Sequence, residues 1–205
     1  MRTESGELNH SRDTVGGRAR RDQIERAAAE VLADVGYAAA SVGRIAERAR
    51  VSKGVITYHF ASKDELLRRV ALRLFEDCAA HVEAGTSGAS TPLERLRAGI
   101  NAELEFFSSR RVQFQAMVEV MANHRDASFV HTFQDVSGSE TEALANLLAE
   151  GQAHGQFRAF DVNEVAHLVS AAKNASLDRW AADETLHLAS LSVVLLDFVE
   201  NAVSA

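Results

Sequence analysis

The sequence predicts an all-α fold, because it combines few helix-breaking residues, alanine-rich stretches and apolar residues at helical spacing. One proline and twelve glycines occur in 205 residues, which disfavours a β fold with its many turns. Runs such as Ala27 to Ala29 favour helix. The clearest helical spacing of apolar residues, i, i+3, i+4 and i+7, falls at Val42, Ile45, Ala46 and Ala49. We therefore expect about nine helices, three in an N-terminal helix-turn-helix domain and the others in a C-terminal helical domain.

Composition indicates a cytoplasmic protein that does not enter a membrane. Hydrophobic residues make up 46% of the chain and charged residues 25%, as in an ordinary soluble protein. No apolar run approaches the roughly 20 residues that span a bilayer, and the polar N-terminus has no signal-like apolar region. The single cysteine, Cys78, cannot form an internal disulfide.

Charge is divided unevenly along the chain. Residues 1–63 hold 11 Lys and Arg against 8 Asp and Glu, a net charge of +3. Residues 64–205 hold 11 against 21, a net charge of −10, and the two segments add up to the −7 of the whole chain. A basic segment followed by an acidic body is compatible with nucleic-acid binding at one end of the protein.

The N-terminal helices have recognisable beginnings and ends. After a polar tail at residues 1–17, an amphipathic helix is expected at 20–36, ending at Gly36. Ser41 can cap a second helix that breaks near Arg50, and Ser52 can cap a third that runs to about His59. Two short helices joined by a tight turn predict a helix-turn-helix, so we place a DNA-binding domain at 18–63.

The remaining residues, 64–205, are expected to form one helical domain. Ser62 and Glu65 match a capping box that begins a long helix to about residue 84. A linker follows at 85–90, and Thr91 with Pro92 begins the next helix. Further helices are expected at about 91–108, 110–123, 127–153, 161–181 and 183–203.

Residues 20–66 closely resemble the tetracycline-repressor (TetR) family of regulators. The resemblance is carried by Gly36-Tyr37, by the segment from Ser41 to Gly54 with its apolar spacing, and by Tyr58-His59-Phe60 followed by Lys63 and Leu66. It joins three helices and the start of a fourth at fixed spacing, and it covers about a quarter of the chain. Two positions depart from the family pattern, since Arg50 stands where glycine is usual and Thr57 where an aromatic residue is common.

The resemblance implies a homodimer that binds double-stranded DNA at a palindromic operator, with the third helix as the reading helix and Lys63 as a phosphate clamp. Long cations such as Arg44 and Lys53 can bond guanine edges or phosphates, and Thr57 can meet a thymine methyl group. For His59 both a phosphate contact and packing beneath the helix stay open. The residues expected at the DNA are Ser41, Arg44, Arg50, Ser52, Lys53, Gly54, Thr57, Tyr58, His59 and Lys63.

The family resemblance also implies a pocket for a small-molecule effector in the C-terminal domain. Soft and aromatic side chains gather in the middle helices, so an apolar or amphipathic effector is expected and no cofactor. The candidate lining residues are Phe75, Cys78, Phe107, Phe114, Met117, Met121, His124, Phe133, Asn174 and Trp180.

The last two helices are apolar on more than one side, which predicts a partner for one of the two faces. An isologous homodimer is the simplest partner, and the resemblance implies a four-helix interface. The residues expected there are Val165, Leu168, Ala172, Leu188, Leu191, Leu195 and Phe198.

The leading hypothesis is a ligand-responsive repressor without enzymatic activity. The enzyme alternative rests on two Glu-x-x-His pairs, Glu164/His167 and Glu184/His187, which resemble half of a carboxylate di-iron signature. On antiparallel helices these pairs would lie about 25 Å apart, so no metal site is expected. An architectural DNA binder without an effector is the third hypothesis.

Overall fold

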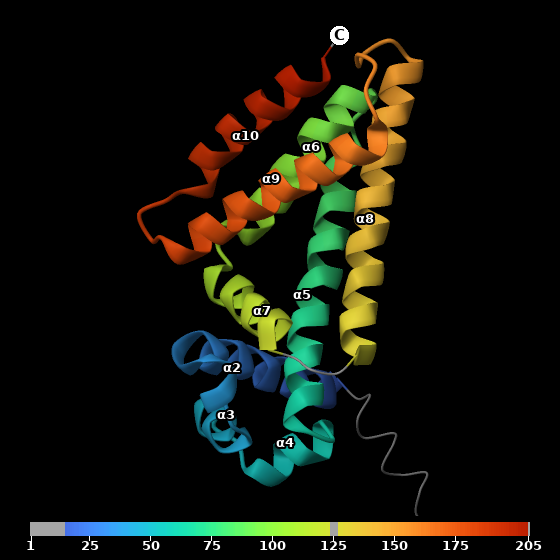
Figure 1. Ribbon diagram of the computed structural model, residues 1–205. Coiled ribbons are helices and arrows are strands. Elements are labelled where there is room, and N and C mark those ends of the chain that lie inside the picture. The colour runs from blue at the N-terminus through green and yellow to red at the C-terminus, as the bar shows by residue number, and fades with distance from the viewer. Residues whose placement is uncertain (1–14, 124–126, 205) are drawn as a thin grey trace, which may run out of the picture. The chain divides into compact units, whose positions relative to one another are not determined.

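The computed structural model describes residues 15–123 and 127–204, and within these ranges the chain forms nine helices and no strand beyond an isolated bridge between Phe157 and Ser204. The all-α prediction is thereby confirmed. The helices, labelled in Figure 1, are α2 (Val15–Ala39), α3 (Val42–Arg48), α4 (Lys53–His59), α5 (Lys63–Thr86), α6 (Pro92–Ser108), α7 (Arg111–Asn123), α8 (Ala127–Ala153), α9 (Val162–Ala182) and α10 (Leu188–Val203).

Contacts divide the chain into two compact units. The N-terminal unit comprises Met1–Leu74 and Val112–Arg125, and the C-terminal unit comprises Phe75–Arg111 and Asp126–Ala205. Helix α5 supplies residues to both units, and all of α7 except Arg111 belongs to the N-terminal one. The helix-turn-helix segment therefore shares one compact unit with the first half of α5 and with nearly all of α7.

Helix α2 is interrupted where the sequence predicted its end. Gly36 has φ 72° and ψ 171°, a backbone conformation that glycine adopts without the steric cost of a Cβ. The helix begins at Val15, so the last three residues of the expected tail are helical; the rest of that tail, 1–14, lies outside the described residues. Beyond Gly36 the backbone N–H of Tyr37 donates to the Glu119 carboxylate of α7 at 3.1 Å, which fixes the start of the next segment.

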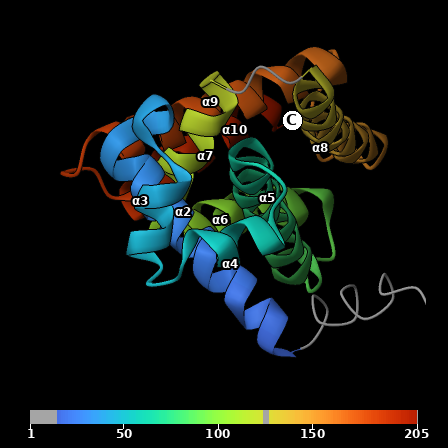
Figure 2. The same cartoon turned by 90° about the horizontal axis from the view of Figure 1, so that it is seen from below.

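The core of the N-terminal unit explains why its two shortest helices are stable. Helices α3 and α4 have seven residues each, too few to persist alone in water. Ile45 of α3 and Ile56 of α4 are almost completely buried, and α3 packs against α2 (Figure 2). The same core contains the fully buried side chains of Ile24, Leu32 and Leu66.

The C-terminal unit is built from longer helices packed in pairs. Helix α8 packs on α9, α6 on α10, and α9 and α10 run antiparallel (Figure 1). A Cβ at Gly151 of α8 would lie 2.0 Å from the Phe157 ring, so the absence of a side chain there lets the chain fold back closely against the helix. Gly155, with φ 69°, ends α8 as expected, whereas Gly151 lies inside the helix.

The last helix begins later than the sequence suggested. Residues 183–187 form a turn in which the Asp183 carboxylate accepts bonds from the Thr185 backbone N–H and hydroxyl, and α10 begins at Leu188. The guanidinium of Arg111 donates to the carbonyls of Asp183 and Leu186, so the turn is satisfied by a distant side chain. In the described part of the chain, no helix is both long and apolar enough to cross a membrane.

Candidate functional site: a helix-turn-helix surface and a cavity

The helix-turn-helix has the capped beginnings that its sequence predicted. Ser41 Oγ accepts from the backbone N–H of Arg44, and Ser52 Oγ accepts from that of Val55, both at 3.3 Å. These caps satisfy N–H groups that the helix itself leaves without partners. Most of the residues expected at the DNA are exposed, namely Ser41, Arg44, Arg50, Ser52, Lys53, Gly54 and Thr57.

The turn between α3 and α4 places Arg50 in a left-handed conformation, with φ 53°. The N–H of Arg50 donates to Glu47 O at 3.0 Å and that of Val51 to Ala46 O at 2.9 Å, a helix-ending pattern that usually employs glycine at this position. Arginine at a left-handed position costs roughly 1 kcal/mol. The side chain is exposed beside the start of α4, where it can reach a phosphate.

The side chain of Lys53 lies over the first turn of α3. A Cβ added to Gly43 would lie 3.1 Å from Lys53 Cε and 3.4 Å from its Nζ, so Gly43 leaves the space that the lysine side chain uses. Thr57, one turn further along α4, donates its hydroxyl to the carbonyls of Lys53 and Gly54 at 3.3 and 3.2 Å. The cation and the threonine thus share one exposed face of α4.

Lys63 is held at the first residue of α5 by Tyr37. Its Nζ donates to the Tyr37 carbonyl at 2.9 Å and lies 4.7 Å from the centre of the Tyr37 ring. The Tyr37 hydroxyl donates to Asp64 at 3.0 Å, and burial followed by that carboxylate raises the pKa of Tyr37 to about 12. Because an ammonium group has three N–H donors, this arrangement positions Lys63 and still leaves it donors for a phosphate.

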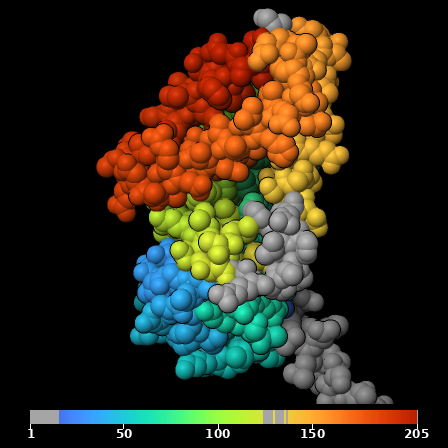
Figure 3. Space-filling view, in the orientation of Figure 1, coloured from blue at the N-terminus to red at the C-terminus, as the bar shows by residue number. Residues whose placement is uncertain are grey.

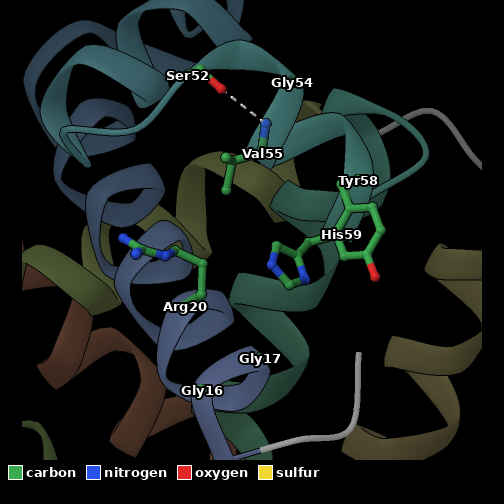
Figure 4. A pocket seen from close by; sticks show the side chains of 8 residues that line it. All are labelled: Gly16, Gly17, Arg20, Ser52, Gly54, Val55, Tyr58 and His59. Carbon is green, nitrogen blue, oxygen red and sulfur yellow. Dashed lines mark hydrogen bonds between the residues drawn. The ribbon is translucent and has the colours of Figure 1, made fainter. Parts of the chain in front are cut away.

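A cleft of about 480 Å³ separates the first turns of α2 from α4 (Figure 4). Gly16, Gly17 and Arg20 line one side, while Ser52, Gly54 and Val55 line the other with Tyr58 and His59. The His59 ring meets Tyr58 edge to face, with centres 5.1 Å apart, and its Nδ1 atom is buried. This orientation favours the packing interpretation of His59 over an outward phosphate contact.

Other basic residues of the N-terminal unit are committed to ion pairs. Arg48 of α3 bonds Glu30 and Asp34 of α2. Arg73 of α5 bonds Asp22 and Glu25 of α2. These pairs hold α2 to its neighbours, so neither Arg48 nor Arg73 is assigned to DNA contact.

The C-terminal unit contains a cavity of about 450 Å³ between α5, α6, α8 and α9. One wall is polar, with Lys173 Nζ bonded to the Glu103 carboxylate at 2.5 Å and Glu140 nearby. Arg95, bonded to Glu150, lines another part. The apolar lining includes Ala79, Val82, Leu96, Ile100, Leu144 and Leu147.

Two titratable groups in this cavity are shifted toward their neutral forms. Burial, followed by the carboxylates of Glu103 and Glu140, raises the pKa of Cys78 to about 12. Burial also raises the pKa of Glu140, against the opposing effect of Lys173. The Cys78 thiol is therefore a neutral part of the wall at physiological pH.

Most of the residues predicted for the effector pocket lie elsewhere. Among the eight whose side chains the structure describes, Cys78 alone lines this cavity. Phe114, Met117 and Met121 are on α7 in the N-terminal unit, because α7 packs there. Phe75 is half-buried and Asn174 exposed, Phe107 packs edge to face on Phe106, and Trp180 is buried beneath the Arg111 guanidinium. His124 and the side chain of Phe133 lie outside the described residues.

Most of the other cavity residues carry a weak signal in the sequence. Leu96, Ile100 and Leu144 are ordinary apolar positions, indistinguishable in sequence from core. Glu103 and Lys173 are 70 residues apart, and only the packing of α6 and α9 makes them a pair.

Helices α9 and α10 expose an apolar face on the C-terminal unit, and Figure 3 shows the two helices side by side at the surface. Leu168 of α9 is 65% exposed and Phe198 of α10 is 58% exposed, in agreement with the predicted face. Val193 and Val194, which were not predicted, are 69% and 68% exposed. Val165, Ala172 and Leu191 are partly buried beside this face.

Two of the residues predicted for a dimer interface lie in the core of the C-terminal unit. Leu188 and Leu195 are 3% and 5% exposed, because the stripe that they share with Val199 packs inward toward α6. Ser192, on the same stripe, donates its hydroxyl to Asn101 of α6 at 2.6 Å. Helix α10 thus carries apolar residues on two sides, and Leu188 and Leu195 lie on the side that packs inward.

The Glu-x-x-His pairs are far apart. Glu164 is in the first turn of α9, while Glu184 and His187 follow the end of that helix. At about 1.5 Å per residue, the helix between them separates the pairs by roughly 27 Å. No group of three or more potential metal ligands occurs among the residues that the structure describes. The di-iron alternative therefore has no geometric support.

Comparisons with known proteins agree with the helix-turn-helix. The family described as "Bacterial regulatory proteins, tetR family" matches residues 24–70. The HTH-type transcriptional activator FasR of Mycolicibacterium smegmatis is 40% identical over 87 residues, 42% of this chain and 40% of that protein. The HTH-type transcriptional repressor KstR2 of the same organism is 27% identical over 143 residues, 68% of each chain.

A solved structure extends the similarity to the rest of the chain. The TetR family transcriptional regulator PfmR of Thermus thermophilus has a TM-score of 0.77 at 24% identity, covering 87% of this chain and 97% of that one. At this identity the likeness concerns the fold. The chain spans about two fifths of the length of the first curated relatives that it matches, FasR among them.

Proposed function

Because this chain belongs to the TetR family of bacterial regulatory proteins, we propose that it is a ligand-responsive transcriptional repressor of the cytoplasm. It binds a palindromic DNA operator as a homodimer and is released by a small-molecule effector. The observation that carries the proposal is the exposed face of α3 and α4, where Arg44, Lys53 and Thr57 surround two capped helix beginnings.

In this proposal α4 enters the major groove. Lys53, at the first residue of α4, reaches a guanine edge or phosphate, and Thr57 meets a base one turn further on. Arg44 and Arg50 contact phosphates on either side of the turn. Lys63 binds a phosphate at the beginning of α5, held in position by its bond to Tyr37.

The homodimer is supported by the exposed apolar face of α9 and α10. Leu168, Val193, Val194 and Phe198 are all more than half exposed, which is unusual for residues of this type on a monomer surface. A second copy of the same face covers them by twofold symmetry. The two helix-turn-helix segments of one dimer then match the two half-sites of the operator.

Helix α5 is the element that can couple effector to DNA. It begins at Lys63 and further along contributes Cys78 and Val82 to the cavity wall. An effector that binds more tightly to an arrangement of α5 in which the protein cannot bind DNA releases the operator. By thermodynamic linkage, DNA binding lowers the affinity for the effector by the same factor.

Selection of duplexes from a random DNA library by the purified protein tests the central part of the proposal. We expect an enriched inverted repeat whose half-sites lie about one helical turn or somewhat more apart. Placing that repeat between promoter and reporter gene should lower transcription in the presence of the protein. Enrichment of no sequence, or stimulation of the reporter, would contradict repression at an operator.

Lys63→Gln tests the phosphate contact, because glutamine removes the charge and can still donate to the Tyr37 carbonyl. We expect weaker binding to all duplexes alike and a salt-dependence slope lower by about one unit per half-site. A changed base preference with an unchanged slope would show that Lys63 reads bases instead.

Sedimentation of Phe198→Asp and Leu168→Asp tests the dimer. A charge in the apolar face should produce monomers with weakened operator binding. Asn146→Asp adds the same charge at an exposed position of α8 and should stay dimeric. If the Phe198 and Leu168 variants sediment like the control, the dimer uses another surface.

A further inference from the structure

The polar wall of the C-terminal cavity carries more negative than positive charge. Glu103 of α6, Glu140 of α8 and Lys173 of α9 all line it. The Glu103 and Lys173 side chains are 20% and 14% exposed and bond each other at 2.5 Å. That pair is electrically neutral, so the negative charge of Glu140 is the net charge of these three residues.

The remaining charged lining does not reverse this excess. The Arg95 guanidinium bonds Glu150, which neutralises it, and Glu83 is exposed and adds a further carboxylate. Glu140 lines the cavity although much of the residue is exposed to solvent, and the partial burial of its carboxyl group raises its pKa. A ligand that brings a cation to this carboxylate would replace the lost solvation.

We propose that the cavity binds an apolar molecule bearing one basic amine, with its ammonium group at Glu140 and its hydrocarbon part against Val82, Leu96, Ile100 and Leu144. An anionic group would add negative charge beside two carboxylates. It would have to withdraw Lys173 from Glu103 and leave that buried carboxylate without its ion pair, which is costly. The inference rests on the proposed function only in taking the cavity as the effector site.

Calorimetric titration of the full chain with decylamine, decanol and decanoate tests the preference, because the three probes share one hydrocarbon length and differ in charge. We expect the amine to bind at least about tenfold more tightly than the alcohol, as for a hydrogen bond to a charged group, and the carboxylate to bind most weakly. Decanoate binding as tightly as decylamine, or no binding of the amine, would overturn the proposal.

Glu140→Gln keeps the size of the side chain and removes its charge. We expect decylamine affinity to fall by about tenfold, to the level of decanol, with decanol affinity unchanged. Glu142→Gln makes the same change two residues away on α8, at a position that is also exposed but does not line the cavity, and should keep the amine preference. An amine preference that survives Glu140→Gln would contradict the assignment.

Two further measurements test where the amine binds and whether Glu140 acts through its charge rather than through the local structure. Cys78 is the one cysteine in the sequence and lines the cavity, so bound decylamine should slow its reaction with a thiol reagent. Glu140 faces Glu103, Lys173 and Cys78 from the other three helices. Decylamine affinity should decrease as pH falls through the raised pKa of Glu140, since the protonated acid no longer pairs with the ammonium, and this decrease should be absent in Glu140→Gln.

Release of operator DNA is measured separately with the same probes. Decylamine that binds through Glu140 and releases the operator supports both the site and the effector role. Binding through Glu140 without release supports the site and overturns ligand-responsive release. The two proposals can therefore fail independently.

Discussion

The N-terminal and C-terminal units hold their helices in different ways. In the N-terminal unit, the seven-residue helices α3 and α4 depend on the caps Ser41 and Ser52, and ion pairs from Arg48 and Arg73 tie α2 to its neighbours. In the C-terminal unit, helices of 16 to 27 residues pack through broad apolar faces and close approaches such as Gly151 to Phe157. The first unit thus adds caps and ion pairs to a small core of short helices, whereas the second relies mainly on the packing of long helices.

Gly151→Ala tests the packing of the C-terminal unit and has the largest expected effect. Its methyl group would overlap the Phe157 ring, so the unfolding free energy should fall by about 2–3 kcal/mol. Gly138→Ala, on the same helix with no atom within 4 Å of the added Cβ, should be neutral or stabilising by up to about 1 kcal/mol. Urea denaturation measures both variants, and equal effects would show that α8 does not depend on this contact.

Arg73→Met tests the polar attachment of α2 to α5. The Glu25 side chain is 8% exposed, and burial raises its pKa in spite of the bond from Arg73. Without Arg73 its charge loses its ion pair and keeps only the weaker influence of Arg69, so we expect a loss of about 2 kcal/mol at pH 7.

The same variant has a defined pH dependence. Loss of Arg73 removes the main influence that lowers the pKa of Glu25, so the folded-state pKa rises further above the unfolded value. The folded protein then takes up a proton as pH falls toward the unfolded pKa, and the deficit should be smaller at pH 5 than at pH 7. Arg48→Met, which removes an ion pair between exposed side chains, should have a much smaller effect and serves as the control. A deficit independent of pH would mean that Glu25 is not responsible.

Arg50→Gly tests the effect of Arg50 on stability separately from its effect on DNA binding. It has the smallest expected effect on the unfolding free energy. Glycine relieves the left-handed strain at φ 53° and should stabilise the protein by roughly 1 kcal/mol. Operator affinity should fall at the same time, because the phosphate contact proposed for Arg50 is lost. Arg50→Ala keeps most of the strain and should weaken DNA binding without the gain in stability. A gain in stability with unchanged operator affinity would remove Arg50 from the DNA surface.

The difference between local capping signals and tertiary packing explains which features of the structure the sequence predicted well. The caps at Ser41 and Ser52 and the helix start at Thr91 all form as predicted, since a cap involves residues at most three positions apart. The predicted effector pocket did not have this support. Its candidates were chosen by residue type, and aromatic side chains such as Phe107 and Trp180 proved to be core.

The two faces of α10 show, within one helix, the same limit of predicting burial from the sequence. Periodicity revealed that two sides are apolar, but the stripe of Leu188 and Leu195 and the exposed Val194 and Phe198 are equally hydrophobic in sequence. The packing of α6 against the first stripe decides which of them remains exposed.

By itself, the sequence determined most of the helices, the capped beginnings of α3 and α4 and the break at Gly36, because each depends on neighbours within about one helical turn. Only the tertiary structure decided that α7 joins the N-terminal unit and that Glu103, Glu140 and Lys173 meet in one cavity. These residues come from three helices, and their proximity depends on how apolar faces pack, which no local spacing encodes.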